Sequence, residues 1–130
     1  MTIELIYLAA TLILALAQVL LPAGIRELEF GLVWGTGSRD HTPVSKNLIL
    51  GRLERAKANL YETLPLFIGA VLIAHVTGAE SALTLWGAAL YFWARLAYIP
   101  LYALGVPVVR SLVWMVSLVG LILILAALFI

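Results

Sequence analysis

Most of this chain consists of apolar runs that are each long enough to cross a lipid bilayer. A transmembrane helix takes about 20 mainly apolar residues, and four runs predict such helices over residues 3–21, 53–76, 81–103 and 107–130. Hydrophobic residues make up 64% of the 130 residues, against about 45–50% in soluble domains, and a soluble chain this short has no core large enough for them. The sequence therefore predicts an all-α membrane protein, a single domain built as a four-transmembrane-helix bundle.

Turn-forming residues mark the ends of these runs. The first run stops at Pro22-Ala23-Gly24, the second at Gly78 and the third before Gly105, while Pro107 suits the first position of a helix. The longest connection, residues 23–52, holds several glycines and mixed charges. We expect it to form a loop at the membrane surface.

The composition excludes several kinds of chemistry. Cysteine is absent, so any thiol chemistry must use a thiol that a ligand brings. The two histidines, His41 and His75, are far apart and show no metal-ligand spacing, so we expect no metal site and an incidental role for both. The net charge of +1, without a basic tract, indicates no nucleic-acid partner.

The basic residues predict the orientation in the membrane. The loop between the second and third predicted helices contains Glu80 but no lysine or arginine. All eight basic residues lie near the first loop or near the turn between the third and fourth helices: Arg26, Arg39, Lys46, Arg52, Arg55, Lys57, Arg95 and Arg110. The positive-inside rule then places the first and third loops in the cytoplasm and both termini outside.

Three polar residues share one face of the predicted second helix. Arg55, Asn59 and Glu62 are spaced i, i+4 and i+7, which places them one above another. A charge deep in the bilayer costs roughly 2.5–3.5 kcal/mol on insertion scales. Such residues usually face protein or a water-filled cavity, so this face is the first candidate for a functional site.

Polar residues of the next two helices are expected at the same membrane depth. Arg95, Tyr98 and Tyr102 share a face of the third helix, and Arg110 and Ser111 begin the fourth. In an antiparallel bundle all three sets lie at the cytoplasmic end. Arginines bind carboxylates through paired hydrogen bonds, and the second-helix carboxylate would take an ammonium. The set therefore suits a small, multiply charged ligand.

Each of these residues also has a purely structural interpretation. Arg95 and Arg110, near helix ends, could extend toward lipid headgroups and only anchor the topology. Asn59 could form a helix–helix hydrogen bond, and Glu62 could pair with Arg55. Lys57 and Arg52 are expected to face solvent or headgroups.

The arrangement resembles the MAPEG family, the membrane-associated proteins of eicosanoid and glutathione metabolism. The run RAKANLYE at 55–62, followed by PLF at 65–67, is similar to the second-helix motif of that family. ARLAY at 94–98, Tyr102 and the segment 107–111 resemble its third- and fourth-helix signature. The resemblance covers nearly the whole chain, and the form is closest to the short bacterial branch. It implies an integral protein of the bacterial inner membrane, in contact with membrane lipids.

The resemblance also implies a homotrimer that binds glutathione, as co-substrate, between neighbouring subunits near the cytoplasmic face. The residues that would hold glutathione are Arg55, Asn59, Glu62, Arg95, Tyr98 and Tyr102. The thiolate would be stabilised by Arg110, with Ser111 assisting. The implied activity is a glutathione-dependent transferase or peroxidase acting on apolar electrophiles.

Some positions depart from the family pattern. Lys57 stands where animal members commonly have histidine, Leu60 replaces an acidic residue, and Trp114 stands where tyrosine is frequent. The alternative function is a non-catalytic, lipid- or partner-binding membrane protein that retains the family fold. A transporter or channel is less favoured, because the polar residues cluster at one end rather than run through the membrane.

Overall fold

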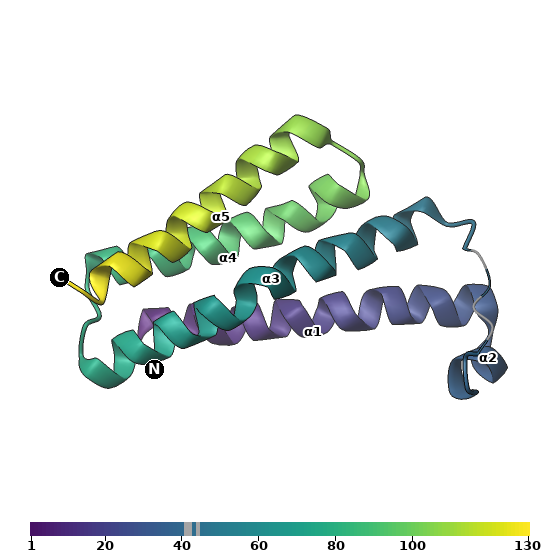
Figure 1. Cartoon of the computed structure of the whole chain (residues 1–130), viewed down its shortest axis with the longest axis horizontal. Coiled ribbons are helices and arrows are strands. Elements are labelled where there is room, and N and C mark those ends of the chain that lie inside the picture. Colours follow the sequence, from purple (N-terminus) through teal and green to yellow (C-terminus); the bar gives the residue numbers. More distant parts are fainter. Residues whose placement is uncertain (41–42, 44) are drawn as a thin grey trace.

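The described residues form four long helices and one short one. The structure is a computed structural model that describes every residue except 41, 42 and 44, so the expectation for His41 lies outside the described residues. The helices are α1 (Ile3–Phe30), α2 (Leu32–Thr36), α3 (Leu48–Thr77), α4 (Ala82–Ala103) and α5 (Pro107–Ala127). Figure 1 shows the long helices running back and forth. Both chain termini and the α3–α4 connection lie at one end, the termini end, whereas α2 and the α4–α5 turn lie at the other, the α2 end.

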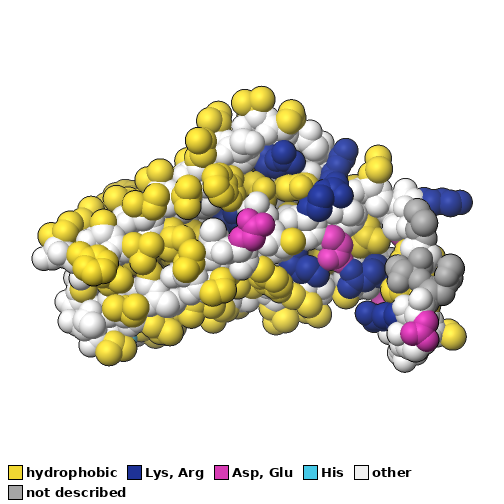
Figure 2. All heavy atoms as spheres, in the orientation of Figure 1, with side chains coloured by type: hydrophobic (Ala, Val, Ile, Leu, Met, Phe, Trp, Pro, Cys, Tyr) yellow, Lys and Arg dark blue, Asp and Glu magenta, His cyan; other side chains and the backbone are white. Residues whose placement is uncertain are grey.

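Within the described part of the chain, α1, α3 and α5 are long and apolar enough to cross a membrane. The fourth predicted span, α4, has 22 residues, but Arg95 and several tryptophans and tyrosines lower its hydropathy. Hydrophobic side chains cover much of the molecular surface, and lysines and arginines gather toward the α2 end (Figure 2). The surface thus has the distribution expected of a protein solvated by lipid, with its basic residues at one end.

The predicted end of the first helix at residue 21 is wrong, because α1 continues through Pro22 to Phe30. A proline inside a helix removes one backbone hydrogen bond without forcing the helix to stop, and Pro22 is buried. The helix ends instead at Gly31, whose φ of 86° is the conformation glycine adopts most readily. Part of the predicted loop is therefore helix, and α3 likewise begins at Leu48 rather than near residue 53.

The centre of the bundle is aromatic and aliphatic. Tyr91 of α4 is fully buried and stacks on Phe67 of α3, with ring centroids 4.1 Å apart. Its hydroxyl lies 2.8 Å from the Thr63 hydroxyl, which satisfies a polar group that has no water available. Leu121 and Ile124 of α5 and Leu8 and Ala15 of α1 belong to the same cluster, so one core joins all four long helices.

Two glycines bring α4 and α5 into close contact. A β-carbon added to Gly120 would lie 2.5 Å from the Gly87 carbonyl oxygen and 2.8 Å from the Tyr91 amide nitrogen. A β-carbon on Gly87 would meet the Gly120 carbonyl oxygen at 2.6 Å. Small residues at such positions let helix backbones approach each other in membranes, and this contact lies in the termini-end half of the hairpin.

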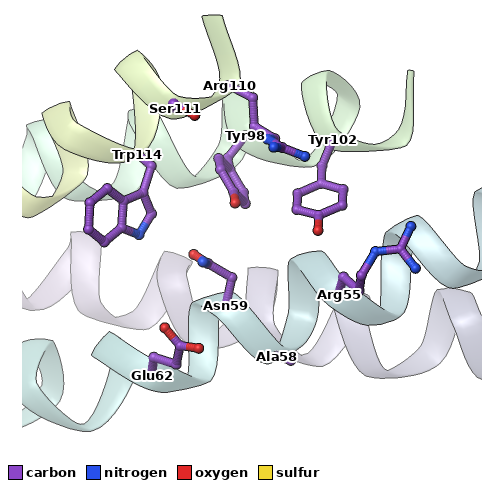
Figure 3. A pocket seen from close by; sticks show the side chains of 9 residues that line it. All are labelled: Arg55, Ala58, Asn59, Glu62, Tyr98, Tyr102, Arg110, Ser111 and Trp114. Carbon is purple, nitrogen blue, oxygen red and sulfur yellow. The ribbon is translucent and has the colours of Figure 1, made fainter. Parts of the chain in front are cut away.

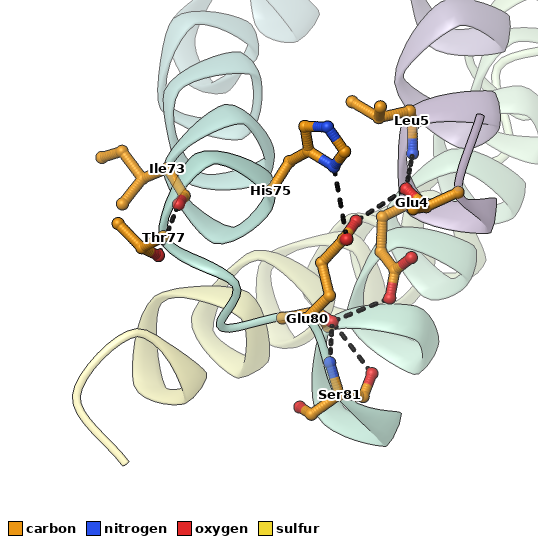
Figure 4. Close-up of polar contacts among 9 residues, drawn as sticks. Glu4, Leu5, Ile73, His75, Thr77, Glu80 and Ser81 are labelled. Carbon is orange, nitrogen blue, oxygen red and sulfur yellow. Dashed lines mark hydrogen bonds and ion pairs between the residues drawn. The ribbon is translucent and has the colours of Figure 1, made fainter.

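Side-chain hydrogen bonds hold the termini end together (Figure 4). Thr2, at the start of α1, donates to Glu80 over 2.6 Å, and His75 Nδ1 lies 3.3 Å from the other oxygen of that carboxylate. Nearby, the Thr84 hydroxyl of α4 lies 2.8 Å from the buried Glu4 carboxylate of α1. These contacts, the termini clasp, join α1 to the α3–α4 connection and to α4.

We predict that Gly120→Ala destabilises the protein by about 1–3 kcal/mol, because the new methyl group meets backbone atoms that can move only if the helices separate. Gly69→Ala is the matched control, since a β-carbon there meets nothing within 4 Å. It should be neutral or stabilise α3 by up to about 1 kcal/mol. Thermal unfolding in detergent compares the two, and equal effects would contradict close α4–α5 packing.

The termini clasp should make stability depend on pH. The hydrogen bond from Thr2, and to a smaller extent His75, lowers the pKa of Glu80, and burial opposes that shift. A lowered carboxylate pKa in the folded state stabilises the fold at neutral pH, and this contribution disappears as the pH falls through the folded-state value. Thermal midpoints between pH 7 and pH 3 should therefore fall more for the unmodified protein than for Glu80→Gln. In a Thr2→Val background, the acid-induced loss of thermal midpoint should differ less between the proteins with and without Glu80→Gln.

Candidate functional site

A cavity of about 410 Å³ opens between α3, α4 and α5 in the half of the bundle toward the α2 end (Figure 3). Its lining comes from all three helices: Arg55, Ala58, Asn59, Glu62, Tyr98, Tyr102, Arg110, Ser111 and Trp114. This set contains seven of the eight residues that the sequence singled out, the exception being Arg95. Whether they bind glutathione stays a prediction, but the structure brings them around one space.

Helical periodicity explains how residues far apart in the sequence reach this space. Arg55, Asn59 and Glu62 follow one face of α3, as their spacing predicts. Tyr98 and Tyr102 are one turn apart on α4, and their rings meet edge to face with centroids 5.6 Å apart. Figure 3 shows Arg55 and Glu62 at opposite ends of the cavity. The cavity therefore has a cationic end and an anionic end.

Two arginines converge on one tyrosine. The Arg110 guanidinium carbon lies 4.5 Å from the centroid of the Tyr102 ring, and that of Arg55 lies 5.9 Å from the same ring. Guanidinium groups are attracted to aromatic faces at such distances. Arg110 is therefore held against the cavity wall, rather than extended away from it toward headgroups.

The charges around the cavity are not paired with one another. Among the described residues, no ion pair involves Arg55, Arg95, Arg110 or Glu62; the pairs join Arg26 and Lys57 to Glu54, and His75 to Glu80. The expected alternative of an Arg55–Glu62 pair is thus not formed. Guanidinium groups without a carboxylate partner produce a positive potential in the cleft that they line. The cavity is accordingly suited to an anion.

Arg95 is placed differently from the prediction that it contacts the ligand. Its side chain is 1% exposed and its Nη1 donates to Asn59 Oδ1 over 2.9 Å. Its guanidinium carbon lies 4.5 Å over the Tyr98 ring, and its Nε and Nη2 have no hydrogen-bond partner in the described part of the chain. Arg95 therefore lies behind the cavity wall, and Asn59 forms the interhelical hydrogen bond that its structural interpretation predicted.

Ser111 and Trp114 complete the α5 wall. The Ser111 hydroxyl donates to the Pro107 carbonyl of its own helix over 3.2 Å, so it must rotate to donate to a ligand. Trp114 lies at the same end of the cavity as Glu62 (Figure 3). Sequence reasoning missed Ala58 as a lining residue, although its position three residues after Arg55 on the α3 face was the available signal.

Two basic residues near the cavity, Arg52 and Lys57, form contacts within the protein. Arg52 Nη1 donates to the Ala103 carbonyl over 3.1 Å, and so satisfies a backbone group at the end of α4. Lys57 lies 2.9 Å from Glu54, which also accepts from Arg26 of α1. Both residues are only partly exposed, and the expectation that Arg52 and Lys57 face solvent or headgroups stays a prediction. These contacts fasten α3 to its neighbours beside the cavity.

The family model of the MAPEG family matches residues 7–130, which includes every residue that lines the cavity. The chain belongs to the MAPEG family. Neither the curated proteins nor the solved structures give a significant match. MAPEG membership confirms the resemblance drawn from the helix motifs. It also joins this chain to a family that includes glutathione transferases and peroxidases along with other members.

The unpaired arginines should matter little for stability. Arg55→Met and Arg110→Met break no ion pair and remove only contacts with Tyr102, so each should change the free energy of unfolding by at most about 1 kcal/mol. Asn59→Leu should lower it by about 1–3 kcal/mol, because it leaves the buried Arg95 without its acceptor. Thermal unfolding in detergent tests this order. A larger loss for either arginine variant would show that it supports the fold.

Proposed function

We propose that this MAPEG protein binds glutathione in the cavity and directs its thiolate at apolar electrophiles. The products would be conjugates, or the alcohols formed when lipid hydroperoxides are reduced. One observation carries the proposal: Arg55 and Arg110 reach the cavity without a carboxylate partner among the described residues, opposite a single free carboxylate, Glu62.

The charges of glutathione complement those of the cavity. The tripeptide carries two carboxylates, one ammonium and a thiol that becomes negative when it ionises. Arg55 can take a carboxylate through paired, charge-assisted hydrogen bonds. Glu62, at the opposite end, can take the ammonium. Asn59 and the phenols of Tyr98 and Tyr102 supply further polar contacts from the two walls between these ends.

Arg110 is the residue we assign to the reacting sulfur, with Ser111 assisting after its hydroxyl rotates. A free thiol has a pKa of about 8.5, and a neighbouring cation increases the thiolate fraction at neutral pH. The thiolate can attack an electrophilic carbon and expel its leaving group. Alternatively it attacks the distal oxygen of a hydroperoxide, and a second glutathione then converts the sulfenic acid to a disulfide and water. Because the chain has no cysteine, the nucleophile comes from the ligand.

The same proposal includes the assembly and the membrane topology. Arg55, Ala58, Glu62 and Ser111 are exposed in the single chain, although they belong to helices that we place in the bilayer, with α4 as the fourth span. A neighbouring subunit would cover them, so we propose the family homotrimer with glutathione between subunits. The basic α2 end would face the cytoplasm of a bacterial cell, and the protein would reside in the inner membrane.

Glutathione binding and transfer test this function. Calorimetry on the detergent-purified protein should detect binding, and Arg55→Ala should raise the Kd at least about 10-fold by removing a charge-assisted hydrogen bond. Arg110→Ala should lower kcat for conjugation to an aromatic halide by about 100-fold, the effect of removing one stabilising donor.

Arg39→Ala is the control, because Arg39 hydrogen-bonds to Gly35 in the first connection and does not line the cavity. It should leave both Kd and kcat unchanged. The absence of glutathione binding at millimolar concentration would overturn the proposal. Thermal stabilisation by phospholipid but not by glutathione would favour the non-catalytic alternative.

A further inference from the structure

The buried hydrogen bond between Arg95 and Asn59 fixes the chemistry of one part of the cavity wall. We infer that Arg95 is a positioning residue, which holds the Asn59 amide so that its NH₂ group is presented to the cavity as a donor for an anionic group of the ligand. The inference rests on the proposed function for the identity of that ligand, glutathione, but the orientation of the amide is a property of the protein alone.

The orientation follows from what each side chain can donate or accept. A guanidinium has only donors, so the Asn59 atom that meets Arg95 Nη1 must be the carbonyl oxygen Oδ1. The two N–H groups of Asn59 must then find acceptors elsewhere. No described residue accepts from them, and Asn59 lines the cavity. The acceptor that fits is therefore a group of the ligand.

Arginine performs this task better than a neutral residue of similar length. Glutamine carries both a donor and an acceptor, so it could bond Asn59 in either orientation and would not fix the amide. Lysine has only donors and would fix it as arginine does. Arg95 also carries a charge that forms no ion pair with a carboxylate in the described part of the chain. A positive charge behind the amide makes its N–H groups stronger donors.

The surroundings of Arg95 keep it in this supporting position. The side chain is 1% exposed, and its guanidinium lies over the ring of Tyr98, itself a buried wall residue. Reaching the cavity would require this ring contact and the Asn59 hydrogen bond to break. Arg95 thus acts on the ligand through Asn59, in contrast to Arg55, which lines the cavity itself.

The side-chain amide can be observed directly, without any ligand. The chain has two asparagines, Asn47 and Asn59, so ¹⁵N-asparagine labelling gives two NH₂ signals by NMR, and Asn47→Ser assigns them. We expect Arg95→Lys to keep the Asn59 signal near its original position, and Arg95→Gln to shift or split it. An Asn59 signal that is the same in Arg95→Gln and the unmodified protein would overturn the inference.

A double-mutant cycle on glutathione affinity then tests how Arg95 acts. Calorimetry should show that Arg95→Gln raises the Kd about 10-fold in the unmodified protein, but less than 2-fold when Asn59→Leu is already present. Arg95→Lys should restore most of the affinity. Arg55→Gln is the matched control and should weaken binding equally in both backgrounds, because it acts on the ligand directly.

The outcomes separate the inference from the proposed function. Additive effects of Arg95→Gln and Asn59→Leu would mean that Arg95 contacts the ligand itself, and would overturn the positioning role while leaving glutathione binding in place. If the unmodified protein binds no glutathione, the proposed function fails, and the NMR signal of Asn59 alone decides whether Arg95 orients the amide. Size-exclusion chromatography in detergent shows which variants remain folded and assembled.

Discussion

The contact between Gly87 and Gly120 sets how closely α4 and α5 approach, and the position of the cavity follows from it. Each glycine faces the other's carbonyl oxygen at a distance that leaves no room for a β-carbon. In this half of the hairpin, the core joins α5 to α3 and α4. Toward the α2 end, side chains as large as Tyr98, Arg110 and Trp114 occupy the space between the helices. The cavity therefore lies in the half of the α4–α5 hairpin where large side chains, rather than glycines, stand between the helices.

The two ends of the bundle differ in whether their charged side chains have partners within the protein. At the termini end, Glu80 accepts from Thr2 and contacts His75, and Glu4 meets the Thr84 hydroxyl. At the other end, the guanidinium groups of Arg95 and Arg110 lie over tyrosine rings. Neither forms an ion pair with a carboxylate of the described residues. Arg55 and Arg110 form no ion pair within the described part of the chain, so the fold does not depend on a carboxylate partner for either residue. Under the proposed function, the carboxylates of glutathione would be the partners of these arginines.

Periodicity was enough to predict which residues share the cavity, because a helix of known phase fixes the face of each side chain. It could not predict contacts that depend on side-chain rotamers. Arg95 shares a face with Tyr98, as expected, yet its guanidinium turns to Asn59 rather than to the cavity. The end of α1 was mispredicted because a proline weakens a helix at one position without ending it, and tertiary burial of Pro22 decided the outcome.

If the proposed function holds, membership of the MAPEG family constrains the thiol substrate more than the electrophile. The motif residues Arg55, Asn59, Glu62 and Arg110 lie in the part of the chain that the family model matches, and under the proposed function they bind the thiol substrate, glutathione. Discrimination among electrophiles has to come from wall positions outside that charge pattern. Ala58 leaves one wall bare, and Trp114 closes the end near Glu62 with a flat apolar surface. A hydrophobic wall discriminates between substrates by only about 1–3 kcal/mol for each methylene by which they differ. Under the proposed function, this cavity should therefore be selective for the thiol substrate and accept many apolar electrophiles.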